Sequence, residues 1–486
     1  PLAPLAPLAP LAPAEPPAPT EPPAPAPPPA SAAEGVADEP KAERKRKSDE
    51  PPPSSTPVMY LRTKFPLLGA SCSAGGGLLA LGGGGGGAKT GTPNTLMLCS
   101  LSADGILERG RHRTGAEAPT RLSLDGGGTS VLAVLQSRVV LYRVGQLQDV
   151  ATLDGPSPLE EMQRLELGVA SDGESAATKL AAGCAAGDLP VELIPYSARF
   201  SPDGSLVAVG MENGALILYA RDADSGAYVE RWRRKAHKKE VKDVAFGAGG
   251  GLLCSVAPDY QCLAFALGPS GALTGEPSAV AQPSFRFYRE NKYNKGKGAQ
   301  WRCIAVGEPA GGGASPLLFG ALNHVGGPGW VARCALNGGS CEAYSQVASS
   351  PLTALALAAN GSHVAVGTSD GELIVLDART LAQLHKSQPH ALFVTSLLLC
   401  PADAPSGTAA VTCAGDNSCI LTPLPPAVLK PSGRGAAFWL SLLLALLAVL
   451  YLFVGRAAST TLPDAPSVGA ALSEAPGVIE EPAQPP

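Results

Sequence analysis

SPDGSLVAVGMENGALILY, from Ser201 to Tyr219, and AANGSHVAVGTSDGELIVL, from Ala358 to Leu376, are two near copies of one pattern. Each copy contains a polar turn, a short apolar strand, a second polar turn with Gly, and another apolar strand. This order is typical of the middle of a four-stranded β-propeller blade, and its recurrence indicates a repeat architecture. We therefore predict an all-β, WD-repeat-type propeller.

Short apolar strands separated by Gly, Asp, Asn and Pro turns continue from residue 58 to residue 426, which we predict to be the propeller. Seven blades are the preferred count and six the alternative. The candidate blades are residues 58–107, 117–155, 192–232, 237–272, 285–337, 345–386 and 390–424. A long polar stretch, residues 156–190, is interpreted as an insertion. A closed ring suits so many short strands because it protects their edges.

Two His–Asp pairs support the blade assignment. His237 precedes one strand and Asp259 follows the next, and His390 and Asp416 repeat this arrangement. WD-repeat blades place a His and an Asp at such positions, where they form a buried hydrogen-bond network that fixes a turn. We interpret all four residues as structural. The WD dipeptides themselves are absent from these repeats.

Composition argues against several functional classes. The formal net charge of −5 gives no basic field for nucleic acid. The stretch 285–298 mixes basic and aromatic residues, and a strand followed by a solvated loop is preferred there over a single-strand binding site. No Ser-His-Asp set, paired carboxylates or metal-ligand spacing points to an enzyme. The eleven cysteines form no CxxC pair, so we expect buried thiols in a reducing compartment.

Residues 436–455, AAFWLSLLLALLAVLYLFVG, contain no charge and are predicted to form a transmembrane helix. Twenty helical residues span about 30 Å, the thickness of a bilayer core. Trp439 and Tyr451 lie near the two ends, as interface anchors do. Lys430 and Arg434 precede the span, which favours a cytosolic propeller and a lumenal tail.

The remaining segments are short or of low complexity. Residues 1–57 are rich in Pro and Ala and are predicted to be disordered. The basic run within them, residues 41–47, is interpreted as a solvated linker or a patch near anionic lipid, with a nuclear signal as the alternative. Residues 427–435 are expected to be a linker, and residues 456–486 a short tail.

A run of six glycines, from Gly82 to Gly87, precedes the sequence AKTGTPN. It does not fit a phosphate-binding P-loop, because Ala88 stands where that motif needs Gly. Pro93 and an apolar strand also follow where the motif needs a helix. A glycine run between two strands could hold a cation through its carbonyls, approach a partner closely or serve as a linker. The residues alone leave these three possibilities open.

The pattern GGGG, then G-x-P-N, between the first two strands of a propeller resembles the endoplasmic-reticulum guanine nucleotide exchange factors of COPII vesicle formation. This family includes the animal prolactin regulatory element-binding protein. The positions that carry the resemblance are Gly83, Gly84, Gly85, Gly86, Gly91, Pro93 and Asn94. It extends to HALFVTSLLLCP, residues 390–401, to the AGDNS turn that follows, and to the apolar span after the propeller.

The resemblance implies exchange activity toward a Sar-type small GTPase at the endoplasmic-reticulum membrane, without covalent chemistry. It also implies that a potassium ion orders the glycine loop and that Asn94 contacts the GTPase. Lys89 and the additional glycines depart from the family pattern. The alternatives are a related, non-catalytic propeller that assists the exit of particular cargo, and a general assembly scaffold.

Overall fold

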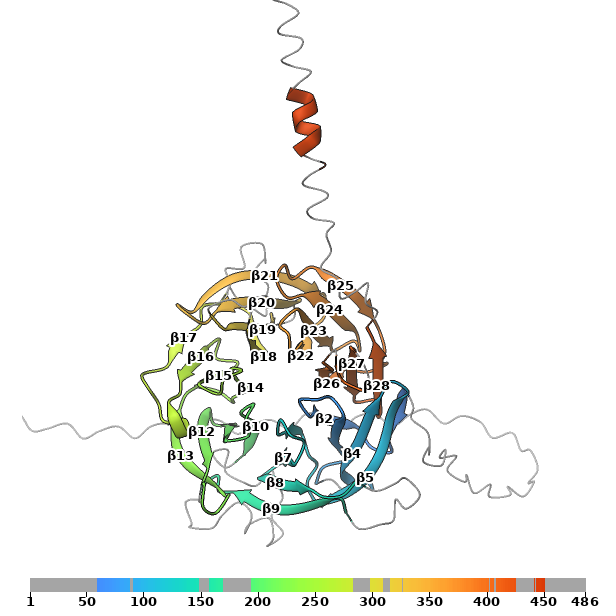
Figure 1. Cartoon of the computed structure of the whole chain (residues 1–486), viewed down its shortest axis with the longest axis vertical. Helices are drawn as coiled ribbons and strands as arrows, with labels where there is room; N and C mark the ends of the chain where they lie inside the picture. The colour runs from blue at the N-terminus through green and yellow to red at the C-terminus, as the bar shows by residue number, and fades with distance from the viewer. Residues whose placement is uncertain are drawn as a thin grey trace, which may run out of the picture. The chain divides into compact units, whose positions relative to one another are not determined.

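The computed structural model describes residues 59–87, 91–147, 157–168, 194–282, 298–308, 315–325, 327–401, 403–405, 408–424, 441 and 443–450. Within these ranges, the strands form seven antiparallel sheets of four strands each, arranged as blades around a ring (Figure 1). The prediction of an all-β propeller with seven blades is confirmed.

The first four blades each contain four strands that are consecutive in sequence. Blade 1 contains β2 (Leu67–Cys72), β3 (Leu78–Gly83), β4 (Asn94–Ser102) and β5 (Gly105–Gly115). Blade 2 contains β6 (Arg121–Leu124), β7 (Ser130–Val134), β8 (Val139–Val144) and β9 (Leu159–Leu165). Blade 3 contains β10 (Pro195–Phe200), β11 (Leu206–Met211), β12 (Ala215–Arg221) and β13 (Tyr228–Lys235). Blade 4 contains β14 (Asp243–Phe246), β15 (Leu252–Val256), β16 (Cys262–Ala266) and β17 (Ser278–Ala279), with the 3-10 turn η4 (Pro269–Gly271) after β16.

Blades 5 and 6 repeat this order, and blade 7 takes its fourth strand from the N-terminal side of the propeller. Blade 5 contains β18 (Gln300–Gly307), β19 (Leu317–Asn323), β20 (Gly329–Ala335) and β21 (Ser340–Ala348). Blade 6 contains β22 (Leu352–Leu357), β23 (His363–Thr368), β24 (Leu373–Asp377) and β25 (Gln383–Ser387). Blade 7 contains β26 (Val394–Leu399), β27 (Ala409–Ala414), β28 (Ser418–Pro423) and β1 (Tyr60–Arg62).

The ring closes through the antiparallel pairing of β1 with β28, in which Tyr60 faces Ile420 and Arg62 faces Ser418. The chain therefore completes the last blade with its first strand, which leaves no open edge at the seam. Thr63 extends this contact, because its amide donates to the Asn417 carbonyl at 2.8 Å.

The hydrophobic core lies between the blades. Seven clusters of buried residues among the described residues each join two neighbouring blades. Side chains alternate along a strand, so Leu79 and Leu81 enter the cluster toward blade 7 and Ala80 enters the cluster toward blade 2. Both faces of the second strand of a blade are thus buried, which explains why its sequence is continuously apolar.

Short polar side chains connect the innermost strands of adjacent blades. The Ser71 hydroxyl accepts a hydrogen bond from the Leu124 amide at 2.8 Å, and the Ser123 hydroxyl accepts one from the Phe200 amide at 3.2 Å. Across the seam, the Ser396 hydroxyl accepts a hydrogen bond from the Ala70 amide at 3.1 Å. These bonds satisfy backbone groups near the centre of the ring that a blade cannot satisfy within its own sheet.

Several predicted boundaries were wrong. Residues 58–107 are not one blade, because β1 belongs to blade 7 and blade 1 continues to Gly115. The insertion at 156–190 contains β9, the outermost strand of blade 2. Blade 5 runs from Gln300 to Ala348, beyond the predicted limit of 337. Outermost strands were missed because one of their faces is solvated, so their sequences are polar.

Residues 441 and 443–450 are helical. Among the described residues, no helix is both long and apolar enough to cross a bilayer. The predicted span 436–455 lies mostly outside those residues. The predicted segments 1–57, 427–435 and 456–486 lie wholly outside them, as does most of the stretch 285–298.

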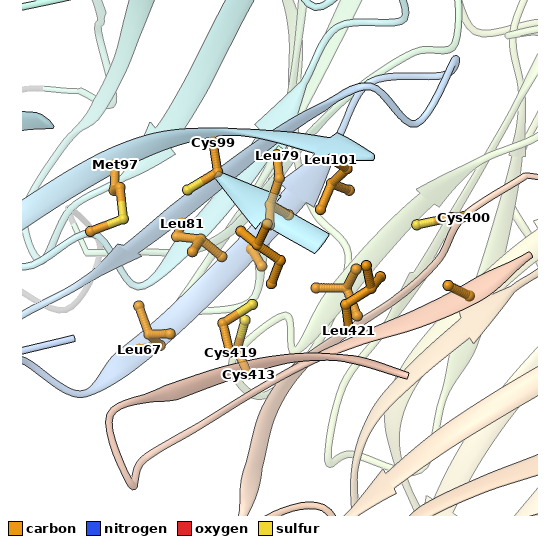
Figure 2. Packing of buried hydrophobic residues seen from close by; sticks show 14 of the residues in the cluster. Leu67, Leu79, Leu81, Met97, Cys99, Leu101, Cys400, Cys413, Cys419 and Leu421 are labelled. Atoms are coloured by element: carbon orange, nitrogen blue, oxygen red, sulfur yellow. The ribbon is translucent and has the colours of Figure 1, made fainter. Parts of the chain in front are cut away.

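Leu421 provides a test of the seam. It lies on β28, is 2% exposed, and belongs to the cluster that joins blades 7 and 1 (Figure 2). We expect Leu421→Ala to lower the free energy of unfolding by about 2–5 kcal/mol, because it removes buried apolar surface and leaves a cavity. Urea denaturation measures the change. Leu147→Ala, at a side chain that is 42% exposed, should stay within about 0.5 kcal/mol of the wild type, and equal effects would contradict the assignment.

Candidate functional site

The glycine loop, residues 84–93, joins β3 to β4 and therefore the second to the third strand of blade 1. It was expected between the first two strands of the propeller, but β1 and β2 both precede β3. Because the strands are antiparallel, all turns between second and third strands lie at the same end of the ring as the blade-to-blade connections. We call this end the connection face. The segment after the loop is a strand, in agreement with the rejection of a P-loop.

Asn94 fixes the loop. Its side-chain oxygen accepts a hydrogen bond from the Gly86 amide at 2.9 Å. Its side-chain nitrogen donates to the Gly86 carbonyl at 3.1 Å and to the Gly115 carbonyl at 3.0 Å. Only 6% of Asn94 is exposed. The Asn94 side chain was expected to contact a partner protein, whereas in the structure it holds Gly86 against the end of β5.

The glycines at the start of the loop are required by close approaches. A Cβ on Gly83 would lie 1.9 Å from the Pro66 carbonyl oxygen. A Cβ on Gly84 would lie 2.3 Å from the Asn94 side-chain oxygen, and Gly84 has a φ of +147°. Gly86 and Gly91 also have positive φ, at +69° and +72°. Gly85 and Pro93 are half-buried, and residues 88–90, including Lys89, lie outside the described residues.

Two buried polar residues that the sequence did not single out are Gln136, which lies beside the loop, and Glu117. A Cβ on Gly87 would lie 3.7 Å from the Gln136 side-chain oxygen, which is buried and has no hydrogen-bond partner among the described residues. Glu117 is 1% exposed and accepts hydrogen bonds from the Ser137 amide and hydroxyl at 2.6 and 2.9 Å. Arg138 Nε lies 3.3 Å from the other Glu117 oxygen. Glu117 thus joins the connection after blade 1 to the turn in blade 2, and this turn brings Gln136 next to the loop.

The connection face also carries two exposed apolar side chains. Leu392 and Phe393 lie in the connection from blade 6 to blade 7 and are 48% and 46% exposed. Gly415 lies beneath the Phe393 ring, where an added Cβ would approach a ring carbon to 3.0 Å. Their exposure could not be predicted from the sequence, since they adjoin an apolar strand. They place an apolar contact surface on the same face as the glycine loop.

The structure brings together the members of each His–Asp pair. His237 Nδ1 lies 3.3 Å from both Asp259 oxygens, and His237 Nε2 lies 2.8 Å from the Ser255 hydroxyl. His390 Nδ1 lies 3.4 Å from Asp416, and both its ring nitrogens lie 2.8 Å from hydroxyls, those of Ser418 and Thr412. Asp259 also accepts from the Lys238 amide at 2.9 Å. Each pair therefore joins a blade-to-blade connection to the adjacent turn.

A cavity of about 550 Å³ lies at the centre of the ring and is lined by the first strands of the blades. Its charged lining residues include Arg199 and Asp243, which form an ion pair at 3.3 Å. Among the described residues, no group of three or more His, Cys, Asp or Glu side chains could hold a metal ion.

No protein-family model matches the sequence, and no curated protein matches it.

The first prediction from this site concerns the fit of the loop. We expect Gly84→Ala to destabilise the protein by about 1–3 kcal/mol, because the new Cβ would collide with Asn94 at an unfavourable φ. Gly87→Ala is the matched control, since among the described residues its Cβ would meet nothing closer than 3.7 Å. Urea denaturation of the two variants measures the difference. Equal stability of both variants would contradict the proposed packing.

A second prediction concerns pH. Burial lowers the pKa of His237 and His390 below the ordinary 6.5, against the opposing effect of their Asp partners. Between pH 6.5 and the lowered folded-state pKa, the unfolded chain therefore binds more protons than the folded chain. The free energy of unfolding consequently decreases as the pH falls through this range. We expect lower stability at pH 5.5 than at pH 7.5 in urea denaturation. His390→Asn should reduce this slope, and an unchanged slope would oppose the assignment.

Proposed function

We propose that this chain is a guanine nucleotide exchange factor for a Sar-type small GTPase, acting at the endoplasmic-reticulum membrane to start COPII coat assembly and ER-to-Golgi transport. The observation that carries the proposal is the glycine loop on the connection face, in which the Asn94 side chain binds Gly86 and ties it to Gly115. A backbone without side chains lets a partner approach closely. The resemblance of residues 83–94 to the exchange-factor family supplies the identity of the partner.

Exchange requires differential binding and no covalent chemistry. The propeller would bind the nucleotide-free GTPase more tightly than the GDP-bound form, and linkage then requires that it weaken GDP binding by the same factor. The side-chain amide of Asn94 is occupied by hydrogen bonds within the protein. We therefore assign the contact with the GTPase to the backbone of the glycine loop, and assign Asn94 the role of holding the loop in place. Leu392 and Phe393 would add apolar contact on the same face of the ring.

A potassium ion fits the chemistry beside Gly87. The Gln136 side-chain oxygen and the Ala116 carbonyl oxygen both lie within 4.0 Å of the position that a Gly87 Cβ would take. Neutral oxygen atoms of this kind suit a weakly hydrated monovalent cation, and the buried Gln136 oxygen lacks a partner among the described residues. Gln136, Ala116 and loop carbonyls would hold the ion, which would stiffen the loop when bound.

Membrane attachment would come from residues 436–455. In the described part of this stretch, six large apolar side chains are 52–60% exposed, Leu443, Leu444, Leu446, Leu447, Val449 and Leu450. Such a surface is suited to lipid. Attachment would confine GTPase activation to one membrane and raise the local concentration of the reacting proteins. The propeller would then face the cytosol and the tail the lumen.

The second candidate is a non-catalytic, membrane-anchored propeller that assists the exit of particular cargo. The buried position of Asn94 is compatible with this function, because a loop that is merely well ordered needs the same hydrogen bonds. The two candidates differ in one property. An exchange factor accelerates GDP release, whereas the alternative binds without doing so.

The deciding measurement is fluorescent GDP release from a purified Sar-type GTPase in the presence of residues 58–430. We expect acceleration by the wild-type propeller and a decrease of about tenfold or more with Asn94→Ala. Three hydrogen bonds to the loop are lost, each worth about 0.5–1.5 kcal/mol, and about 1.4 kcal/mol corresponds to a factor of ten.

Asn213→Ala is the matched control. Asn213 lies in the corresponding turn of blade 3, where its side-chain oxygen accepts a hydrogen bond from the Ala215 amide at 2.8 Å. This variant should retain the wild-type rate. Replacing potassium with sodium in the buffer tests the ion independently of the side chain. A folded wild-type propeller that binds the GTPase without accelerating GDP release would reject exchange and favour the second candidate.

A further inference from the structure

Two cysteines face each other on the outer part of blade 5. Cys334 on β20 and Cys341 on β21 are register partners in an antiparallel pair, next to a shift of register at Arg333. Directly opposed residues have Cα atoms about 4.5–5.5 Å apart and side chains on the same face of the sheet. A disulfide needs a Cα separation of about 4.4–6.8 Å. The backbone therefore already meets the distance requirement for a bond between them.

The two thiols differ in their access to solvent. Cys334 is fully buried in the cluster that joins blades 4 and 5, whereas Cys341 is half-buried on the outermost strand of the blade. Along β21, exposed residues alternate with half-buried ones, and Cys341 is one of the latter. Cys341 is thus the more accessible of the two residues, and Cys334 is the buried second thiol.

The electrostatic surroundings favour the same order of reaction. A hydrogen bond with Cys334 lowers the pKa of Cys341 below its ordinary 9.0, and the nearby Arg333 guanidinium acts in the same direction, against burial and the Glu342 carboxylate. The same hydrogen bond raises the pKa of Cys334. Arg333 is held beside the pair by an ion pair with Glu342 at 3.1 Å. Because a thiolate is the reactive form, Cys341 is the better nucleophile.

The chain contains an internal comparison. Cys413 and Cys419 are also register partners, on β27 and β28. Their side chains lie together in the hydrophobic cluster that joins blades 7 and 1, the seam cluster (Figure 2). Both are 0% exposed. This second pair has the same relation within its sheet but no access to solvent, so it serves as a built-in control for reactivity.

We propose that Cys334 and Cys341 form an oxidative modification site, at which a hydroperoxide converts the two thiols into a cross-strand disulfide. The Cys341 thiolate attacks one peroxide oxygen, the O–O bond breaks, and Cys341 becomes a sulfenic acid. The Cys334 sulfur then attacks the Cys341 sulfur, the S–O bond breaks, and water leaves. With hydrogen peroxide, two thiols and one peroxide give one disulfide and two waters, so the sulfurs supply both electrons that the peroxide accepts.

The disulfide would fasten the outermost strand of blade 5 to the rest of its sheet. The pair encloses only the short turn between β20 and β21, so the bond would act locally. Its formation depends on neither the glycine loop nor a GTPase, and the site is independent of the proposed exchange activity.

The test uses the reduced full-length chain, treated with hydrogen peroxide and then unfolded in an excess of N-ethylmaleimide. Trypsin leaves both cysteines in one peptide, residues 334–379, because no Lys or Arg lies between its ends. Mass spectrometry should show this peptide without either alkyl group and lighter by two hydrogens than the unalkylated thiol form. Cys413 and Cys419 should remain fully alkylated in the same sample.

Two variants separate the steps. Cys334→Ser should stop at the sulfenic acid of Cys341, which a dimedone probe labels, and Cys341→Ser should leave Cys334 reduced. Cys419→Ser should not affect the modification of blade 5. Alkylation of both Cys334 and Cys341 in the peroxide-treated wild type would overturn the proposal, as would earlier oxidation of the buried pair. Neither of these wild-type outcomes depends on a variant folding.

Discussion

The pairing of β1 with β28 is the contact on which the rest of the ring depends. Every other blade is made from strands that follow one another in sequence, whereas blade 7 needs a strand that precedes it by more than three hundred residues. The hydrogen bonds of this short strand are reinforced by the seam cluster, in which side chains from blades 1 and 7 pack together (Figure 2). Without this closure, two faces that elsewhere meet a neighbour would be exposed to water.

The same arrangement explains how the first glycines of the loop, Gly84 to Gly87, are held. The loop begins at the end of β3, whose residues pack toward both neighbouring blades, and it contacts the connection that closes the ring. The amide of Gly84 donates to the Pro66 carbonyl at 3.2 Å, and Asn94 ties Gly86 to Gly115. A glycine run in isolation would be costly to order. Here, Pro66, Asn94 and Gln136 lie against the described glycines Gly84, Gly86 and Gly87.

The sequence predicted the buried strands well and the outer strands poorly. LVAVGM and HVAVGT are apolar on both faces because both faces meet a blade, and they stand out as continuous runs. YVERWRRK on β13 is mostly polar because most of its side chains face solvent, and the predicted blade ended at residue 232, inside this strand. The three residues of β1 carry no local signal of their distant partner.

The candidate site was also only partly predictable. The glycine run and Asn94 were found from the sequence, but the direction of the Asn94 side chain was not. That side chain binds Gly115 at the end of β5, and the pairing of β4 with β5, which shifts register between Asn94 and Thr95, cannot be read from the local sequence. Gln136 and Glu117 could not be found, because single polar residues in another blade acquire meaning only through the ring.

The closure also places the two ends of the propeller next to each other. Met59 lies beside Leu421, since its carbonyl accepts the Leu421 amide at 2.9 Å, so the chain enters and leaves the propeller at one place on blade 7. β28 runs away from the connection face, so this place lies at the opposite end of the blade. Both flanking segments are therefore attached on one side of the disc, and the glycine loop opens on the other. A tether attached after Pro423 would therefore leave the connection face, with the glycine loop, accessible to a partner.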